Sequence, residues 1–296
     1  MPSKTRAHIA VLAANFIFGV NFSTVKYITP SVIKPFGLNV CRVSISLVLF
    51  WILYLLKPSK AGIAKKDIPL FILCAITGVA INQLFFIKGL SLTTSIHASL
   101  LSLSTPIIVT IVAAWLLKEN LTMFKLTGLA LGISGAGILI AKRASANTGS
   151  NILLGDILVI INAVSYGFYF VLVRPLMQRY TPLHVIRWVF TLGALIIIPI
   201  GWNQFSATDW TSFSLYHWLC FLFVTLGATF LAYLFNTYGV STLGPSITGA
   251  YIYTQPVFAA IIAILFLGER FDMYKGIAAV LILAGVYIVN MKRKAV

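Results

Sequence analysis

The chain has 296 residues, of which 59% are hydrophobic and 9% are charged, and its formal net charge is +16. Soluble domains carry about 25% charged residues, so this composition excludes a separate soluble domain and predicts a surface that faces mainly lipid. An excess of Lys and Arg in so apolar a chain is typical of cytoplasmic loops beside anionic lipid head groups. No recognition helix or phosphate-binding loop indicates a nucleic-acid partner.

Apolar runs separated by short polar connections predict an all-α integral membrane fold with ten transmembrane helices. A span takes about 20 residues, so the chain has room for about ten. The first run is full length and lacks a small-residue cleavage site, which predicts a retained helix and not a signal peptide. In chain order, the expected helices occupy residues 8–28, 35–56, 68–89, 96–117, 123–141, 153–173, 184–203, 215–237, 246–267 and 272–291.

The polar connections predict the orientation and the division of the chain. With a cytoplasmic N-terminus, most Lys and Arg residues outside the spans fall on the inner side, among them Lys57, Lys60, Lys65 and Lys66. The positive-inside rule therefore predicts that both termini are cytoplasmic. A stretch rich in Ser, Ala, Asn and Gly at 144–151 is expected to link a first unit, residues 1–143, to a second unit, residues 152–296.

The chain contains a diverged internal repeat. Ile96–Arg143 matches Ser246–Arg293 without gaps at a fixed shift of 150, which places Pro106 on Pro256 and Glu119 on Glu269. Each unit holds five expected helices, an odd number, so the second would enter the membrane upside down. Two inverted five-helix repeats are the usual basis of alternating access in transporters, so the duplication predicts transport.

Both copies carry a proline within the fourth helix, then an apolar run that ends in Glu (LLKEN and FLGER), then a glycine-rich fifth helix. This pattern resembles the EamA-type branch of the drug/metabolite transporter superfamily over essentially the whole chain. The resemblance implies ten helices around a central cavity and export of amino acids or other metabolites; related branches exchange sugar phosphates or nucleotide sugars. One departure is Lys118, where the second copy has Gly268.

Polar and aromatic residues inside the expected helices are the candidates for a binding site, since aromatic walls and a few amides hold small amphipathic solutes. Embedded amides also join helices to one another. The residues of the third and fourth helices are expected towards the outer mouth and those of the eighth and ninth towards the inner mouth. The predicted substrate-binding residues are Phe18, Asn21, Asn82, Phe86, Tyr166, Tyr169, Tyr233, Tyr251 and Gln255, and further embedded candidates are Asn15, Gln83, His97, Ser99, Ser102, Asn162, Ser165, Asn236 and Tyr253.

Five basic residues near helix ends are candidate mouth cations, which would attract the carboxylate or phosphate of a cargo; snorkelling towards the membrane surface is the alternative. Lys26, Arg42 and Lys88 are expected near the outer surface, and Arg174 and Arg187 near the inner one.

Four residues are candidates for gating or hinge positions. Pro106 and Pro256 would kink their helices, and Gly19 and Gly167 would act as hinges or close-packing positions. Glu119 and Glu269 are expected to have a structural role, each beside the first turn of the helix that follows it.

Each of the six acids falls in a loop or at a helix end. A proton-coupled carrier usually holds a titratable group at bilayer depth, so we expect a facilitator or an exchanger. The sequence has no metal-ligand spacing and no cofactor motif, and Cys41, Cys74 and Cys220 are expected to be small core residues.

The sequence predicts a monomer or weak homo-oligomer in the inner membrane of a cell, which exports small metabolites, most simply amino acids or related compounds. The main alternative is an exchanger of phosphorylated metabolites. A membrane-embedded enzyme is less favoured because no acids or metal ligands are grouped at depth, and a channel is less favoured because an inverted duplication is typical of carriers.

Overall fold

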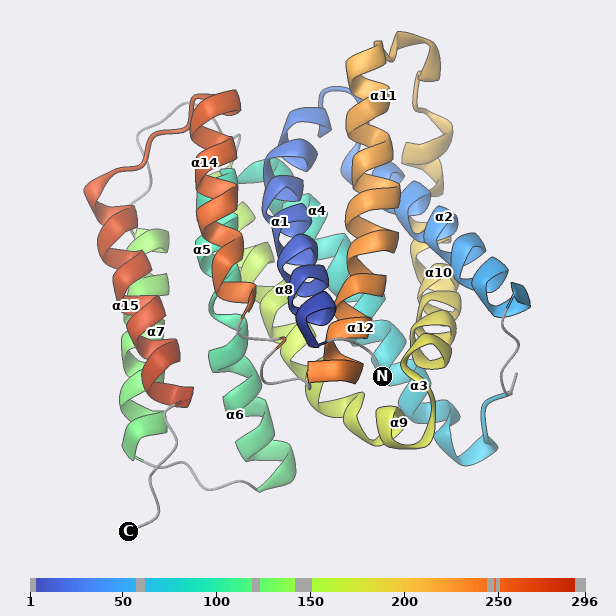
Figure 1. Ribbon diagram of the computed structural model, residues 1–296. Helices are drawn as coiled ribbons and strands as arrows, with labels where there is room; N and C mark the ends of the chain where they lie inside the picture. The colour runs from blue at the N-terminus through green and yellow to red at the C-terminus, as the bar shows by residue number, and fades with distance from the viewer. Residues whose placement is uncertain are drawn as a thin grey trace.

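The computed structural model describes residues 4–56, 62–118, 123–141, 151–243, 248 and 251–290, and every element in these ranges is helical (Figure 1). The first half contains α1 (Lys4–Ile28), α2 (Pro35–Leu56), η1 (Lys65–Asp67), α3 (Ile68–Ala75), η2 (Ile76–Ile81), α4 (Asn82–Leu92), α5 (Ser95–Ser102), α6 (Thr105–Leu117) and α7 (Met123–Ala141). The second half contains α8 (Ile152–Leu172), α9 (Arg174–Arg179), α10 (Pro182–Ser206), η3 (Trp210–Ser212), α11 (Leu215–Leu222), η4 (Phe223–Leu231), α12 (Ala232–Leu243), η5 (Tyr251–Thr254), α14 (Gln255–Leu267) and α15 (Met273–Asn290).

Seven helical stretches of the described chain are long and apolar enough to cross a membrane, and three shorter apolar helices accompany them. The shorter ones are Met123–Ile138, Tyr251–Leu267 and Met273–Gly285. Large apolar side chains such as Leu55, Trp115 and Leu265 are about 70% exposed on the outside of the bundle. In water such a surface would be unfavourable, so it marks the face that meets lipid.

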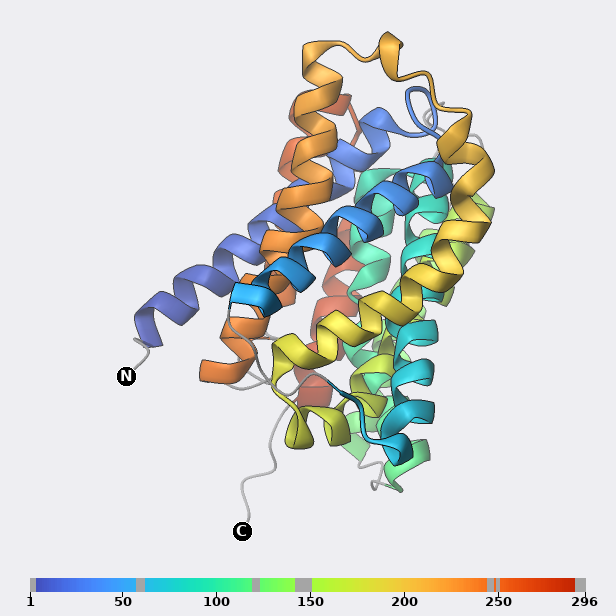
Figure 2. The same ribbon diagram turned by 90° about the vertical axis from the view of Figure 1, so that its right-hand side faces the viewer.

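The helices pair across the sequence (Figures 1 and 2). α2 packs along α10, α4 packs along α8, and α7 packs along α15, while α1 lies against both α12 and α14. Small residues allow the closest of these approaches. A Cβ atom added to Gly285 of α15 would lie 2.5 Å from the Gly128 carbonyl oxygen of α7, so the two backbones touch at that point.

Pro106 and Pro256 each occupy the second residue of a helix, α6 and α14. Both helices follow a break, at Leu103–Ser104 before α6 and at the 3₁₀ turn η5 before α14. Each proline therefore lies just after a break in its expected span, and its role as a gating or hinge position stays a prediction. A proline in the first turn removes an N–H that would have no intrahelical partner in any case, so each proline starts a new helix.

Two helices of the bundle contain a wide π-helical segment, η2 between α3 and α4 and η4 between α11 and α12. Such segments are rare and commonly occur at functional sites. Asn82 and Gln83 follow η2 directly, and Tyr233 lies two residues after η4. The π segments therefore shift the register of the polar residues that come after them.

Candidate functional site

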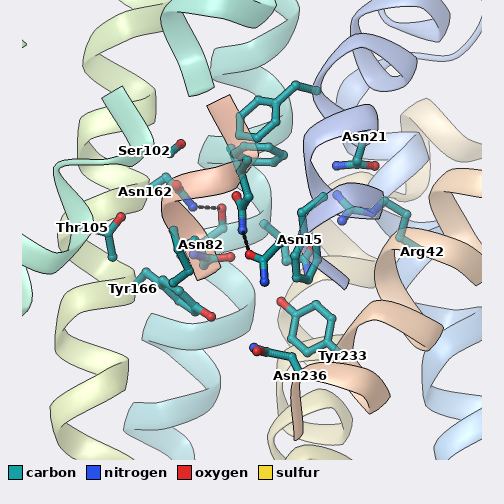
Figure 3. A pocket seen from close by; sticks show the side chains of 16 residues that line it. Asn15, Asn21, Arg42, Asn82, Ser102, Thr105, Asn162, Tyr166, Tyr233 and Asn236 are labelled. Atoms are coloured by element: carbon teal, nitrogen blue, oxygen red, sulfur yellow. Dashed lines mark hydrogen bonds between the residues drawn. The ribbon is translucent and has the colours of Figure 1, made fainter. Parts of the chain in front are cut away.

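The described residues form a cavity of about 130 Å³ in the middle of the bundle (Figure 3). Since a cavity needs about 10–15 Å³ of such space to hold one water molecule, this one can hold several. The lining includes Thr105 at the break before α6 and Gln255 at the break before α14, so both broken helices open onto it. The lining residues are Asn15, Phe18, Asn21, Phe22, Arg42, Asn82, Gln83, Phe86, Ser102, Thr105, Asn162, Tyr166, Tyr233, Asn236, Ile252 and Gln255.

Hydrogen bonds between helices hold several of the amides in place. Gln255 Nε2 donates to Asn15 Oδ1 at 2.7 Å, and this bond joins α14 to α1. Asn162 Nδ2 of α8 donates to the Asn82 carbonyl oxygen at 2.8 Å. These bonds satisfy donors that could not face lipid, and they fix the amides in the cavity wall.

Aromatic rings supply the apolar part of the wall. Phe18 meets Tyr233 edge to face with ring centroids 6.0 Å apart, and Phe22 meets Phe86 in the same manner at 5.4 Å. Such pairs are favoured over parallel face-to-face contact because the ring edges are positive and the faces negative. The cavity therefore combines rigid aromatic surface with amide and hydroxyl groups.

Most of the predicted binding residues lie in this lining, and two lie elsewhere. Tyr169 is stacked on Tyr166 with centroids 5.8 Å apart, behind the lining. Tyr251 places its hydroxyl 2.8 Å from His8 Nδ1 and does not line the cavity. Three lining residues, Phe22, Thr105 and Ile252, were not among the candidates. Thr105 and Ile252 lie at helix breaks that become visible only in the structure.

The expected division into an outer and an inner polar cluster is wrong for the residues nearest the centre. Asn82, Gln83, Phe86 and Ser102 share one cavity with Tyr233, Asn236 and Gln255. Asn82, Gln83 and Phe86 follow the π segment η2, and Tyr233 and Asn236 follow η4.

Arg42 was expected near the outer membrane surface, but it lies inside the bundle at the cavity wall. It is 4% exposed and lines the cavity, and its Nε donates to the Thr229 hydroxyl at 2.8 Å. The reason is geometric: Arg42 is seven residues beyond the start of α2 at Pro35, or about 10 Å into the bundle at 1.5 Å per residue.

The other four cations lie outside the cavity lining. Lys26 Nζ donates to the Ser91 carbonyl oxygen, Lys88 is half-buried, and Arg174 is exposed at the start of α9. Arg187 is buried, with its guanidinium carbon 3.8 Å from the Tyr54 ring centre and 4.7 Å from that of Trp51. A cation over aromatic faces is a stabilising contact within the fold, so Arg187 does not snorkel.

Gly19 and Gly167 sit where helices approach closely. A Cβ atom on Gly19 would lie 2.5 Å from Phe258 Cβ, and one on Gly167 would lie 2.8 Å from Ile108 Cγ2. Any larger residue would push α1 from α14 or α8 from α6. Both positions therefore have a packing role, whatever they contribute to motion.

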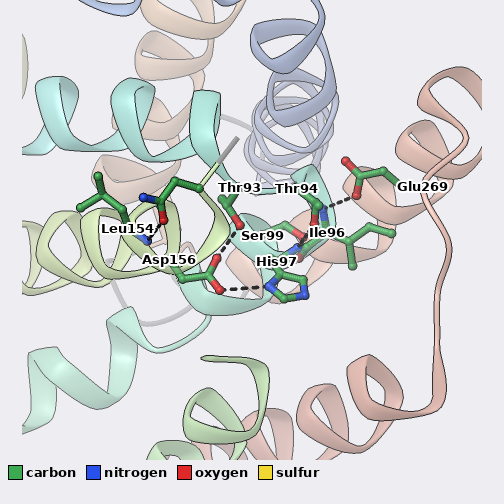
Figure 4. A network of polar contacts seen from close by, with 9 residues as sticks. Thr93, Thr94, Ile96, His97, Ser99, Leu154, Asp156 and Glu269 are labelled. Carbon is green, nitrogen blue, oxygen red and sulfur yellow. Dashed lines mark hydrogen bonds and ion pairs between the residues drawn. The ribbon is translucent and has the colours of Figure 1, made fainter. Parts of the chain in front are cut away.

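A second polar network joins the link between α4 and α5 to two other parts of the chain (Figure 4). Asp156 of α8 accepts a hydrogen bond from the Thr93 hydroxyl and lies 3.1 Å from His97 Nδ1; the side chains of Asp156 and His97 are each 1% exposed. A buried carboxylate requires such partners. Asp156 is thus near a helix start, as expected, and is shielded from water.

Glu269 lies in the same network, and the expectation that it caps the following helix is wrong. Its carboxylate accepts hydrogen bonds from the backbone N–H groups of Ser95 at 2.7 Å and Ile96 at 3.0 Å, in the first turn of α5. Asp272 takes the expected place and accepts from the Lys275 N–H of α15. Glu119, the repeat equivalent of Glu269, lies outside the described residues.

Comparison with solved structures finds the same fold in a crystal structure that superposes with a TM-score of 0.64 at 17% identity over 97% of both chains. Among curated proteins, an uncharacterized transporter of Archaeoglobus fulgidus is 26% identical over 99% of both chains. The uncharacterized transporter YetK of Bacillus subtilis is 23% identical over 84% of this chain and 76% of its own. A probable terminal-alkyne amino-acid exporter of Streptantibioticus cattleyicolor is 27% identical over 77% of this chain and 74% of its own.

The family model described as the EamA-like transporter family matches this chain twice, at residues 5–141 and 153–291. The two matches cover nearly the whole chain. The lining residues of the cavity come from both matched segments. The chain belongs to the EamA-like transporter family, a family of membrane transporters and not of enzymes.

Proposed function

We propose that the protein exports small metabolites, amino acids or related compounds, across the inner membrane by alternating access around the central cavity. The observation that carries the proposal is that residues at the breaks of two helices, Thr105 at the break between α5 and α6 and Gln255 at the break between η5 and α14, line one cavity. Discontinuous helices at a repeat interface are the usual location of a transporter's substrate site. One relative's name as an amino-acid exporter agrees with this class of cargo.

The proposed architecture is ten membrane-spanning segments in two inverted five-helix units, residues 1–143 and 152–296, with both termini cytoplasmic and the chain acting as a monomer or weak homo-oligomer. The two family matches and the internal repeat support it. Alternating access then consists of one unit rocking against the other, with the breaks beside Pro106 and Pro256 as flexing points.

Counterflow in proteoliposomes tests the transport proposal. Vesicles preloaded with unlabelled amino acids should take up labelled amino acids faster than vesicles preloaded with buffer, and the rate should saturate with substrate. Flux that never saturates would indicate a channel. Stimulation by sugar phosphates and not by amino acids would contradict the proposed cargo and favour a phosphorylated-metabolite exchanger, for which Lys88→Gln or Arg174→Gln should abolish uptake.

We also propose that transport is not driven by protons. In the described chain no carboxylate or histidine lines the cavity, and the buried His97–Asp156 pair lies in the separate network of Figure 4. An imposed pH gradient should leave the final accumulation of cargo unchanged. Uphill accumulation that follows the gradient would contradict this part of the proposal.

A further inference from the structure

Arg42 brings a positive charge to the cavity wall, and its surroundings indicate which group would bind there. Of the described lining residues it is the one with a formal charge, and it is 96% buried. Its Nη1 has no hydrogen-bond partner among the described residues. Two ion pairs join described residues to one another, His97 with Asp156 and Arg179 with Asp67, and neither includes Arg42. A buried charge without a counter-charge is costly, and a bound anion would relieve that cost.

The wall across the cavity offers acceptors. Figure 3 shows Ser102, Asn162 and Tyr166 on the opposite side from Arg42. The Ser102 hydroxyl already donates to the Ala98 carbonyl oxygen at 2.7 Å, and Asn162 Nδ2 donates to Asn82. The Ser102 hydroxyl has no second proton to donate, so its oxygen can only accept, and Asn162 Oδ1 is an acceptor in any case. Acceptor oxygens beside the Tyr166 ring suit an ammonium or hydroxyl group.

We propose that Arg42 anchors the carboxylate of the cargo, which lies with its ammonium or hydroxyl groups towards Ser102 and Asn162. The inference rests on the proposed transport function and adds the charge class and the orientation of the cargo. One guanidinium balances the charge of one carboxylate. A phosphate group carries about −1.5 to −2 at neutral pH, which would place a net negative charge in an apolar bundle. The site therefore selects carboxylates over phosphorylated compounds.

Thermal unfolding of the purified full-length protein in detergent tests binding without transport, since a ligand stabilises the state that binds it. Three matched pools at equal concentration serve as probes: α-amino acids, the amines that lack their carboxyl groups, and the acids that lack their amino groups. The wild type should be stabilised by the amino acids and the acids and not by the amines. Arg42→Gln should raise the concentration of amino acids needed for half-maximal stabilisation by at least about 30-fold, as is typical when one partner of a buried charge pair is removed.

Lys34→Gln is the matched control. It removes the same charge eight residues earlier, at an exposed position outside the cavity, and should respond to all pools as the wild type does. If Arg42→Gln does not fold, the comparison of the three pools on the wild type still tests whether the carboxylate is needed for binding. Arg42→Lys keeps the charge and should bind the acids more weakly than the wild type does.

The inference is overturned if amines stabilise the wild type as well as amino acids do, if sugar phosphates stabilise it more than carboxylates, or if folded Arg42→Gln keeps the wild-type response. These outcomes are separable from failure of the transport proposal. Stabilisation by carboxylates without any counterflow would contradict transport and leave the Arg42 site standing. Saturable counterflow with equal use of amines would contradict the Arg42 site alone.

Discussion

At the scale of single residues, the two copies of the repeat differ where α6 and α14 end. Lys118 and Gly268 occupy the same position and both adopt the left-handed conformation, with φ of 54° and 65°. This conformation costs a non-glycine residue about 1–2 kcal/mol. Glycine adopts it without steric strain, and its only cost is the larger conformational entropy that it loses on folding. The first copy therefore stores strain at Lys118 that the second copy avoids.

We expect Lys118→Gly to stabilise the protein by about 0.5–1 kcal/mol and Gly268→Lys to destabilise it by a similar amount. Unfolding in mixed detergent micelles measures both. Lys118 is exposed, so the loss of its side chain should cost little. A destabilised Lys118→Gly variant would mean that the lysine side chain makes a contact worth more than the strain.

Glu269 ties the connection between α14 and α15 to the first turn of α5 through two backbone N–H groups. Glu269→Gln removes the charge that favours this positive helix end and weakens the acceptor, so we expect a loss of about 1 kcal/mol in unfolding free energy. Hydrogen exchange at the amides of Ser95 and Ile96 should speed up. Asp272→Asn, a local cap of α15, should leave those two amides protected; equal exposure in both variants would argue against the tie.

At the scale of elements, α4 and α8 cross at a point without room for side chains. A Cβ atom on Gly155 would lie 2.6 Å from the Thr93 backbone nitrogen and 2.8 Å from the Gly89 carbonyl oxygen. Gly155→Ala should therefore force the helices apart and cost about 1–3 kcal/mol, as overpacking does. Gly137 of α7 has open space around its Cβ position, so Gly137→Ala should be neutral or slightly stabilising. Similar losses in both variants would contradict the packing argument.

Element positions follow from hydrophobic run length, so most of the helices lie near their expected ranges. The breaks at Leu103–Ser104 and Tyr251–Thr254 and the π segments η2 and η4 were not expected, because local apolar composition does not reveal a change in backbone hydrogen-bond register. Several lining residues lie beside or directly after these irregular segments. Asn82 and Gln255 could be named as candidates because they are amides inside apolar helices. The depth of Arg42 and the hydrogen-bond partners of Glu269 depend on how the helices pack, so the sequence did not predict them.

At the scale of the whole molecule, the repeat makes a prediction about sidedness. Arg42 and Arg187 end the matching stretches LNVCR and LHVIR of the two copies. Exposed residues a short way before them, Lys34 and Gln178, should lie on opposite sides of the membrane if the halves are inverted. In parallel halves they would lie on the same side.

Single cysteines in a variant without Cys41, Cys74 and Cys220 test this arrangement. A membrane-impermeant thiol reagent applied to intact cells should label Lys34→Cys and leave Gln178→Cys unlabelled until the membrane is permeabilised. The positive-inside rule sets this direction, since it places the N-terminus and the Lys65–Lys66 connection on the cytoplasmic side. Labelling of both cysteines from outside would rule out inverted halves. The reverse pattern would keep the inversion and turn the protein over in the membrane, so the two parts of the topology are tested separately.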